Sequence, residues 1–152
     1  LRGRPAGSPA GRAAATVTAA VAAVLGMAQL FWALGGTLGL NQAALGERDA
    51  QWHLLTANSG LWALVAAYGI AAVTHRGAGG RTLLLTWVAS GFLFAWGSWK
   101  AAFTHATVAE LPSPDLPWMV ALQNHFGALA GLAVLLIALQ HTYQARQPLT
   151  VG

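Results

Sequence analysis

The chain has 152 residues, of which 56% are hydrophobic and only 8% charged, and its formal net charge is +4. A soluble domain carries about 25% charged residues, so this composition excludes a soluble globular protein, which would have too little polar surface to stay in solution. The basic residues are neither clustered on one element nor interleaved with surface aromatics, which argues against nucleic acid as a partner, and the lack of Cys excludes disulfides, thiolate metal sites and Cys nucleophiles.

Charged residues divide the chain into four long apolar stretches. No Asp, Glu, Lys or Arg occurs between Arg12 and Glu47, between Asp49 and Arg76, between Arg81 and Lys100, or between Asp115 and Arg146. A helix needs about 20 apolar residues to cross the hydrocarbon core, and a backbone in lipid must satisfy its own hydrogen bonds. We therefore predict an all-α integral membrane protein with transmembrane helices at about 14–40, 54–75, 82–105 and 117–141.

The remaining segments are short tails and linkers around one predicted four-helix domain over 14–145. Residues 1–13 form a basic tail rich in Pro and Gly, which we expect to be mobile, and 146–152 form a second tail. The apolar run of the first helix is about twice the length of a signal-peptide core, so we do not expect it to be cleaved. Because the chain opens at Leu1 rather than Met, we expect upstream residues to have been removed or to be missing.

The distribution of charges predicts the orientation of this domain. In a four-helix up-down-up-down bundle, six arginines fall on one side: Arg2, Arg4, Arg12, Arg76, Arg81 and Arg146. The acids fall on the opposite side, accompanied by Arg48: Glu47, Asp49, Glu110 and Asp115. Because loops rich in Lys and Arg stay in the cytoplasm, we expect both termini to be cytoplasmic.

Polar residues within the predicted helices concentrate in the outer half of the bilayer. They occur in the second half of 14–40, the start of 54–75, the end of 82–105 and the start of 117–141. Polar residues at membrane depth normally face the bundle interior. We therefore predict an outward-opening pocket beside Lys100 and His125, with these ligand-binding residues: Gln29, Trp32, Asn58, Trp62, Trp96, Thr104 and Asn124.

Lys100 and His125 each have a structural and a functional interpretation. Lys100 is only about five residues from the end of its helix, so its ammonium can extend to the interface and pair with Glu110 or Asp115. His125 can hydrogen-bond to a neighbouring helix. We prefer these structural roles, and keep as the alternative that Lys100 binds a substrate or anion and that His125 transfers a proton or binds a ligand.

Histidines raise the question of a metal or haem. His53, His105 and His125 all fall on the outer side, where three His and an acid can bind zinc and two His on facing helices can bind haem. No pair has the i, i+4 spacing that makes such a signal specific. We therefore predict no cofactor, with a metal ion or haem as the lesser alternative.

Two pairs of glycines at i, i+4 predict close helix approach. Gly35 and Gly39 are one pair, and Gly127 and Gly131, with Asn124 near the same face, are the other. Small residues at this spacing allow two helix backbones to come together. We expect the second pair to face helix 14–40 or another subunit, so the partners are the lipid bilayer and either a second membrane protein or a further copy.

The end of the first helix reads Phe31-Trp32-Ala33-Leu34-Gly35-Gly36-Thr37. This motif resembles the uncharacterised family of small four-helix bacterial membrane proteins whose first helix ends in an aromatic-x-Trp-Ala-Leu-Gly-Gly pattern. In that family a His commonly precedes the motif, and Gln29 stands in its place here. The resemblance implies a four-helix fold in the bacterial inner membrane and supplies no chemistry.

We carry three functions from different classes. The first is a membrane enzyme or binding protein for a lipophilic small molecule; in an enzyme His125 would be the acid/base, Lys100 an electrostatic stabiliser, and Asp115 or Glu110 a proton partner. The second is an accessory subunit of a larger membrane complex. The third, a transporter component, is the least favoured because the sequence lacks broken helices, inverted repeats and a polar path through the membrane.

Overall fold

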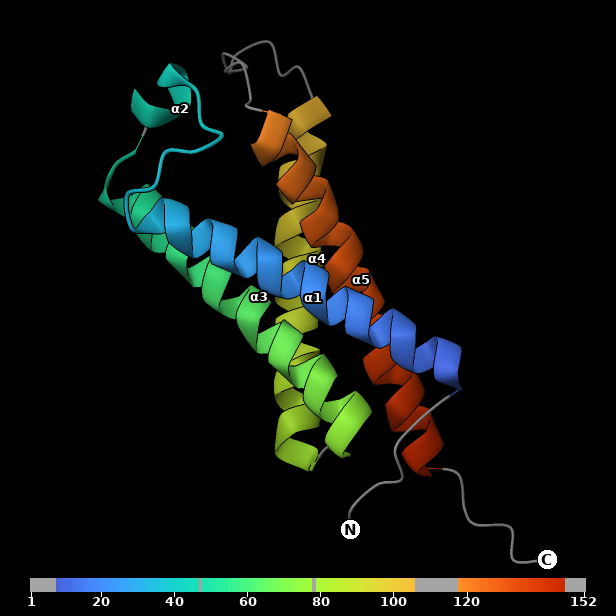
Figure 1. Ribbon diagram of the computed structural model, residues 1–152. Coiled ribbons are helices and arrows are strands. Elements are labelled where there is room, and N and C mark those ends of the chain that lie inside the picture. The colour runs from blue at the N-terminus through green and yellow to red at the C-terminus, as the bar shows by residue number, and fades with distance from the viewer. Residues whose placement is uncertain (1–7, 47, 78, 106–117, 147–152) are drawn as a thin grey trace, which may run out of the picture.

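The structure, a computed structural model, describes residues 8–46, 48–77, 79–105 and 118–146, except for the side chains of 43, 103–105 and 144–146. It consists of helices joined by short connections (Figure 1). The helices are α1 (Pro9–Ala33), α2 (Gln42–Gly46), α3 (Ala50–Arg76), α4 (Gly80–His105) and α5 (Trp118–Arg146). Four of them, all but α2, are long and apolar enough to cross a membrane. The prediction of an all-α protein with four such helices is confirmed, and the described residues contain no strand.

Helix α1 begins earlier in the chain than the sequence predicts. The Ser8 hydroxyl accepts a hydrogen bond from the amide of Gly11 at 3.2 Å, and Pro9 occupies the first helical position. A serine cap followed by proline is a favourable helix start, because the cap satisfies an amide that the helix leaves open and proline lacks one to satisfy. Arg12 therefore lies within α1 rather than in a mobile tail over 1–13.

Helix α1 also ends at Ala33, well before the predicted end at residue 40. Gly35 has a φ of 103°, its amide donates to the Trp32 carbonyl at 3.0 Å, and the Gly36 amide donates to the Phe31 carbonyl at 2.9 Å. This pair of bonds is the Schellman motif, in which glycine adopts the left-handed conformation that stops a helix. Gly35 and Gly39 therefore do not share a helix face, and the prediction that they form a helix-packing pair is wrong.

Helices α1 and α3 are joined by a contact between two glycines. A Cβ atom on Gly26 would lie 2.9 Å from the carbonyl oxygen of Gly60, and a Cβ atom on Gly60 would lie 2.9 Å from the carbonyl oxygen of Gly26. The two backbones therefore touch, an arrangement that small residues allow in membranes. At the far end of the same pair, the Thr16 hydroxyl accepts from His75 Nε2 at 3.2 Å.

Helices α4 and α5 form a second close pair. A Cβ atom on Gly97 would lie 2.5 Å from the amide nitrogen of Ala128, and one on Gly131 would collide with the backbone of Phe94. Gly131 thus packs against α4, which corrects the expectation that the Gly127–Gly131 pair meets helix 14–40 or another subunit. The Trp87 indole donates to the Thr142 hydroxyl at 3.2 Å, which links the pair at its other end.

The two pairs meet through α3 and α4. A Cβ atom on Gly69 would collide with the Thr86 hydroxyl, and the buried core around this contact is built largely of small residues: Ala15, Ala63, Ala66, Ile70, Ala89, Leu93 and Val134. Helix α1 crosses α5 at an angle (Figure 1), and this contact is smaller than the contact within either pair. The seam between α1 and α5 is where the packing leaves space.

Candidate functional site

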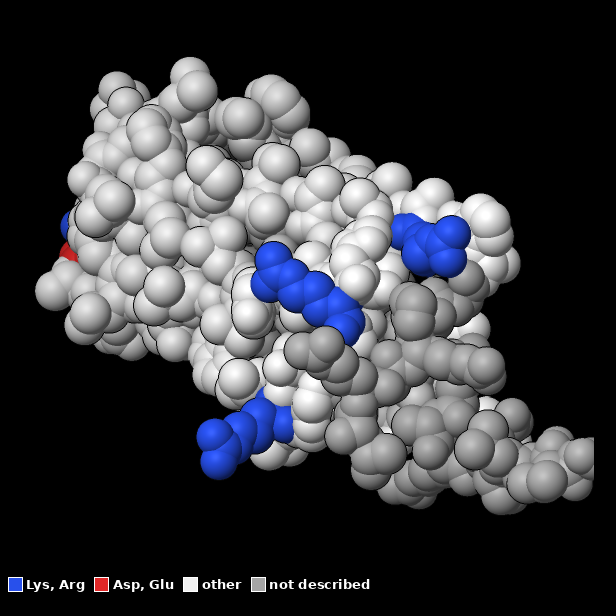
Figure 2. Space-filling view, turned by 60° about the horizontal axis from the view of Figure 1, so that its bottom comes forward, with Lys and Arg blue, Asp and Glu red and all other residues white. Residues whose placement is uncertain are grey.

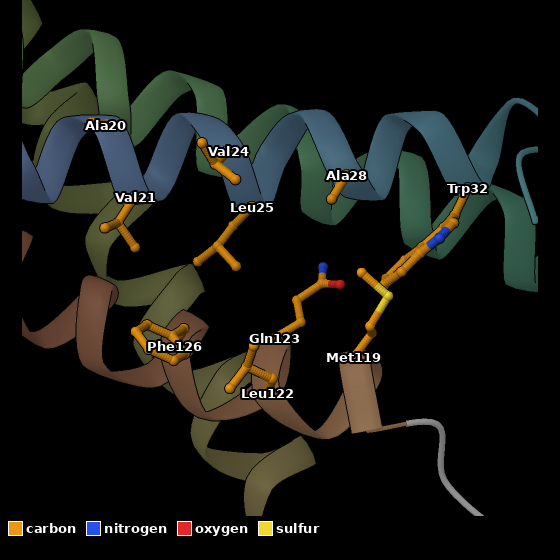
Figure 3. A pocket seen from close by; sticks show the side chains of 10 residues that line it. All are labelled: Ala20, Val21, Val24, Leu25, Ala28, Trp32, Met119, Leu122, Gln123 and Phe126. Carbon is orange, nitrogen blue, oxygen red and sulfur yellow. The ribbon is translucent and has the colours of Figure 1, made fainter. Parts of the chain in front are cut away.

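A cavity of about 410 Å³ lies between α1 and α5 (Figure 3). Its volume is within the range of small-molecule sites in proteins. The lining consists of one stripe from each helix: Ala20, Val21, Val24, Leu25, Ala28 and Trp32 from α1, and Met119, Leu122, Gln123 and Phe126 from α5. All but one of these side chains are apolar or aromatic. Val24, Leu122 and Phe126 are also exposed, so the cavity opens sideways, on the surface that a bilayer would cover.

Among the described lining residues, Gln123 is the one with a polar group aimed at this space. Its side chain is only 9% exposed, and Figure 3 shows its amide pointing from α5 into the cavity toward α1. The amide oxygen Oε1 is buried and has no hydrogen-bond partner among the described residues. A buried acceptor without a partner costs about 1–3 kcal/mol, so the cavity contains an acceptor that a bound molecule can satisfy.

Trp32 and Met119 form the end of the cavity nearest the loop that follows α1. Trp32 is 6% exposed, and its indole donates to the Leu38 carbonyl at 2.8 Å. A Cβ atom on Gly39 would collide with the Met119 sulfur, and Gly39 has a φ of 81°. Only glycine adopts this conformation readily and leaves room for Met119. The loop thus holds both lining residues in place, and the indole N–H of Trp32 is already used.

A cluster of hydrogen bonds ties that loop to the end of α1. The Arg48 guanidinium donates to the carbonyls of Trp32 and, at 3.1 Å, of Gly36, and it lies 4.8 Å from the centroid of the Trp52 ring. The His53 Nδ1–H donates to the Ala33 carbonyl at 2.7 Å. Carbonyls at a helix C-terminus lack partners within the helix, and a cation there interacts favourably with the helix dipole. Arg48 and His53 therefore complete the end of α1.

This cluster gives the Trp-Ala-Leu-Gly-Gly segment a structural role. Its carbonyls accept from Arg48 and His53, its glycines stop the helix, and its Trp32 lines the cavity. The sequence places Arg48 on the outer side between two acids, Glu47 and Asp49, and does not indicate that it binds the carbonyls at the end of α1. The sequence signal for this helix end is the glycine pair at 35–36, three and four residues after Trp32, because a glycine commonly ends a helix.

Three predicted site residues gather in a row of aromatic rings on α3 and α4. The rings of Trp62 and Phe92 lie 5.7 Å apart, those of Phe92 and Trp96 6.3 Å, and those of Trp96 and Trp99 5.4 Å between centroids. Lys100 Nζ lies 5.2 Å from the centroid of the Trp96 ring, within the range of a cation–π contact. The structure thus brings Trp62, Trp96 and Lys100 together, but none of them lines the cavity.

The other predicted polar residues do not converge on one pocket. His125 donates through Nδ1–H to the Ala121 carbonyl of its own helix at 2.7 Å. Asn58 lies on an exposed face of α3, Asn124 is half-buried on α5, and Gln29 is half-buried beside Gly60 with its amide oxygen unpartnered among the described residues. Of the predicted ligand-binding residues whose side chains the structure describes, Trp32 alone lines the cavity.

Some of the predicted site residues lie outside the part of the chain that the structure describes. Glu110 and Asp115 fall in 106–117, and the side chains of Thr104 and His105 are also outside the described residues. Within the described part of the chain, no group of three His, Asp or Glu residues is arranged to hold a metal ion.

Helical phase separates Gln123 from the pocket that the sequence predicts. Residues two apart on a helix point roughly 200° apart, so a pocket assigned to the face of His125 cannot include Gln123. Met119, Gln123 and Phe126 are spaced so that they share one face of the helix. A glutamine at membrane depth on an otherwise apolar face is the sequence feature that could have indicated the cavity.

Comparisons with models of protein families, with curated proteins and with solved structures found no match. The function is therefore argued from the geometry of the cavity.

Proposed function

We propose that this chain is a multi-pass membrane protein that binds a lipophilic small molecule in the cavity between α1 and α5. The observation that supports this function best is a cavity of about 410 Å³ with apolar walls and one buried, unpartnered amide. Sites for small molecules are typically apolar, with a few polar groups that fix the orientation of the ligand. The ligand enters sideways, from the bilayer.

The proposed topology has four spanning helices that run up, down, up and down, with both termini in the cytoplasm of a bacterial cell. Arg12, Arg76 and Arg81 are exposed, and Figure 2 shows basic side chains spread over the end of the molecule where α3 ends and α4 begins. The positive-inside rule assigns that end to the cytoplasm. Arg48 and Asp49 belong to the opposite end, so Trp32 and Met119 lie in the outer half of the membrane.

Binding is favoured over catalysis by the positions of the ionisable residues. Lys100 lies against Trp96 on α4, which does not line the cavity, and His125 donates to a carbonyl of its own helix. Neither residue lines the cavity, and none of the described lining residues has an ionisable side chain. A general acid or base must be within hydrogen-bond reach of the reacting group, so these walls fit a binding protein better than an enzyme.

The glycine pairs do not favour the alternative of an accessory subunit. Gly131 packs against α4 and Gly35 ends α1, so both are accounted for within this chain. The alternative of a transporter component is not favoured either. The described residues around Gln123 in the cavity are apolar, so they do not form a polar path.

The test is to fill the cavity and compare the result with the same substitution elsewhere. Ala28 lines the cavity, whereas Ala95 lies on an exposed face of α4. We expect Ala28→Leu to weaken saturable binding of a long-chain lipophile by tenfold or more, because the new side chain occupies the space of the ligand. Ala95→Leu should leave binding unchanged.

Binding is measured on protein in lipid nanodiscs, by quenching of tryptophan fluorescence with a brominated lipophile. The chain has 7 Trp residues, so the part of the quenching that is lost in Trp32→Phe protein is assigned to Trp32. Trp32 borders the cavity, whereas lipophile dissolved in the surrounding bilayer quenches without saturation. Saturable quenching that is the same in the Ala28→Leu and Ala95→Leu proteins would show that the ligand binds elsewhere.

A further inference from the structure

The amide of Gln123 restricts the chemistry of the molecule that occupies the cavity. Its oxygen is a hydrogen-bond acceptor, buried and unpartnered among the described residues, and it points into the cavity (Figure 3). The indole N–H of Trp32 cannot satisfy it, because that group donates to the Leu38 carbonyl at 2.8 Å. The partner that the cavity lacks is therefore a hydrogen-bond donor carried by the ligand.

Resting on the proposed function, we propose that the ligand is a neutral lipophilic alcohol, whose hydroxyl donates to the Gln123 side-chain oxygen while its apolar body fills the space between α1 and α5. Lipid tails are as apolar as the walls of the cavity, so apolar contact alone does not distinguish a ligand from the bilayer around it. The hydrogen bond to Gln123 supplies the distinction.

The described residues of the lining argue for a neutral headgroup. No Lys, Arg, His, Asp or Glu is among the described residues that line the cavity. An ionised carboxylate or phosphate would be buried there without a counter-charge, which costs far more than burying a hydrogen-bonded hydroxyl. Fatty acids and phospholipid headgroups therefore fit this site worse than an alcohol of the same length.

The size of the cavity sets the size of the apolar body. A cavity of about 150 Å³ accommodates benzene, and this one measures about 410 Å³, which gives room for roughly fifteen carbon atoms on the same scale. Figure 3 shows the Gln123 amide opposite Ala28, with the rest of the cavity extending along α1 toward Val21. A twelve-carbon to sixteen-carbon chain, on the order of this capacity, can therefore place its hydroxyl at Gln123 and lie along α1.

The experiment compares dodecanol that carries bromine on the carbon next to the hydroxyl-bearing carbon with its methyl ether, which has the same chain but no donor. With the hydroxyl at Gln123, a bromine at this position lies at the Trp32 end of the cavity. Both are titrated into wild-type and Gln123→Leu protein in nanodiscs, and the quenching abolished by Ala28→Leu is taken as the signal from the cavity. In the wild type we expect the alcohol to bind about tenfold more tightly than the ether, which corresponds to one net hydrogen bond. In Gln123→Leu we expect this preference to disappear.

The Gln123→Leu variant is suited to the test because it removes an unpartnered buried polar group while nearly keeping the side-chain volume, so it should fold at least as well as the wild type. Equal binding of alcohol and ether to the wild type would overturn the alcohol proposal and leave the proposed binding function standing. Tighter binding of dodecanoate brominated next to its carboxylate than of the alcohol would also overturn it. If neither compound shows saturable quenching, the proposed function itself is wrong.

Discussion

Replacing Arg48 should destabilise the protein, although this residue lies in a connecting segment far from the core. Its guanidinium makes two hydrogen bonds to carbonyls near the end of α1 and a cation–π contact with Trp52. Hydrogen bonds to a charged group contribute about 1.5 kcal/mol each at the low end of their range, and a partly exposed cation–π contact adds about 0.5 kcal/mol. We expect Arg48→Ala to lower the free energy of unfolding by about 3–4 kcal/mol.

The assay is unfolding by SDS in mixed micelles, followed by circular dichroism. Arg48→Lys should recover less than half of the loss, because an ammonium keeps the charge at the helix end but lacks the fork that reaches two carbonyls. Arg81→Ala is the matched control: Arg81 is exposed at the start of α4, and its loss should change stability by no more than about 0.5 kcal/mol. The reasoning is refuted if Arg48→Ala and Arg81→Ala unfold at the same SDS fraction.

Five further substitutions test the packing in the same assay. Gly131→Ala should cost about 2 kcal/mol or more, because the added Cβ collides with the backbone of α4. Gly127→Ala meets nothing within 4 Å and should stabilise the helix by up to about 1 kcal/mol; equal effects of the two would contradict the assigned contact. Gly39→Ala should lower the free energy of unfolding by at least about 1–2 kcal/mol, because the backbone at this position is left-handed. Any further loss is expected from the collision of the new Cβ atom with the Met119 side chain. If Met119→Ala in the same protein restores none of that further loss, the assigned collision is wrong. Trp32→Phe should cost about 1 kcal/mol, since it leaves the loop carbonyl without its donor, and an unchanged SDS midpoint would argue against that bond.

The number and type of the long helices could be predicted from the sequence because charge-free stretches are a one-dimensional signal. The end of α1 could not be found in the same way, since no charged residue occurs between Arg12 and Glu47. Gly35 and Gly39 have the spacing of a helix-packing pair, but the first glycine adopts a φ of 103° and stops the helix. Spacing alone does not separate these two uses of glycine, because both depend on the missing Cβ.

The position of the cavity was less accessible to sequence reasoning. Polar residues were expected to converge, but Lys100 is accommodated by an aromatic ring and His125 by a carbonyl of its own helix. Local partners of this kind let a polar side chain remain within an apolar helix without facing a shared pocket. The cavity arises because α1 crosses α5 at an angle and packs less closely against it. This arrangement depends on the tertiary packing of two helices that are far apart in the sequence.

The close glycine contacts determine which parts of the molecule can move. Backbone touches backbone within the pair α1–α3 and within the pair α4–α5, so each pair can yield only if a whole helix moves. The seam between α1 and α5 is instead bridged by side chains such as Leu25 and Phe126, which change rotamer on timescales of picoseconds to nanoseconds when exposed. The two helix pairs are therefore rigid, whereas the cavity between them is lined by side chains that can move. Ligands of different width can be accommodated by rotamer changes in the lining, without a change within either helix pair.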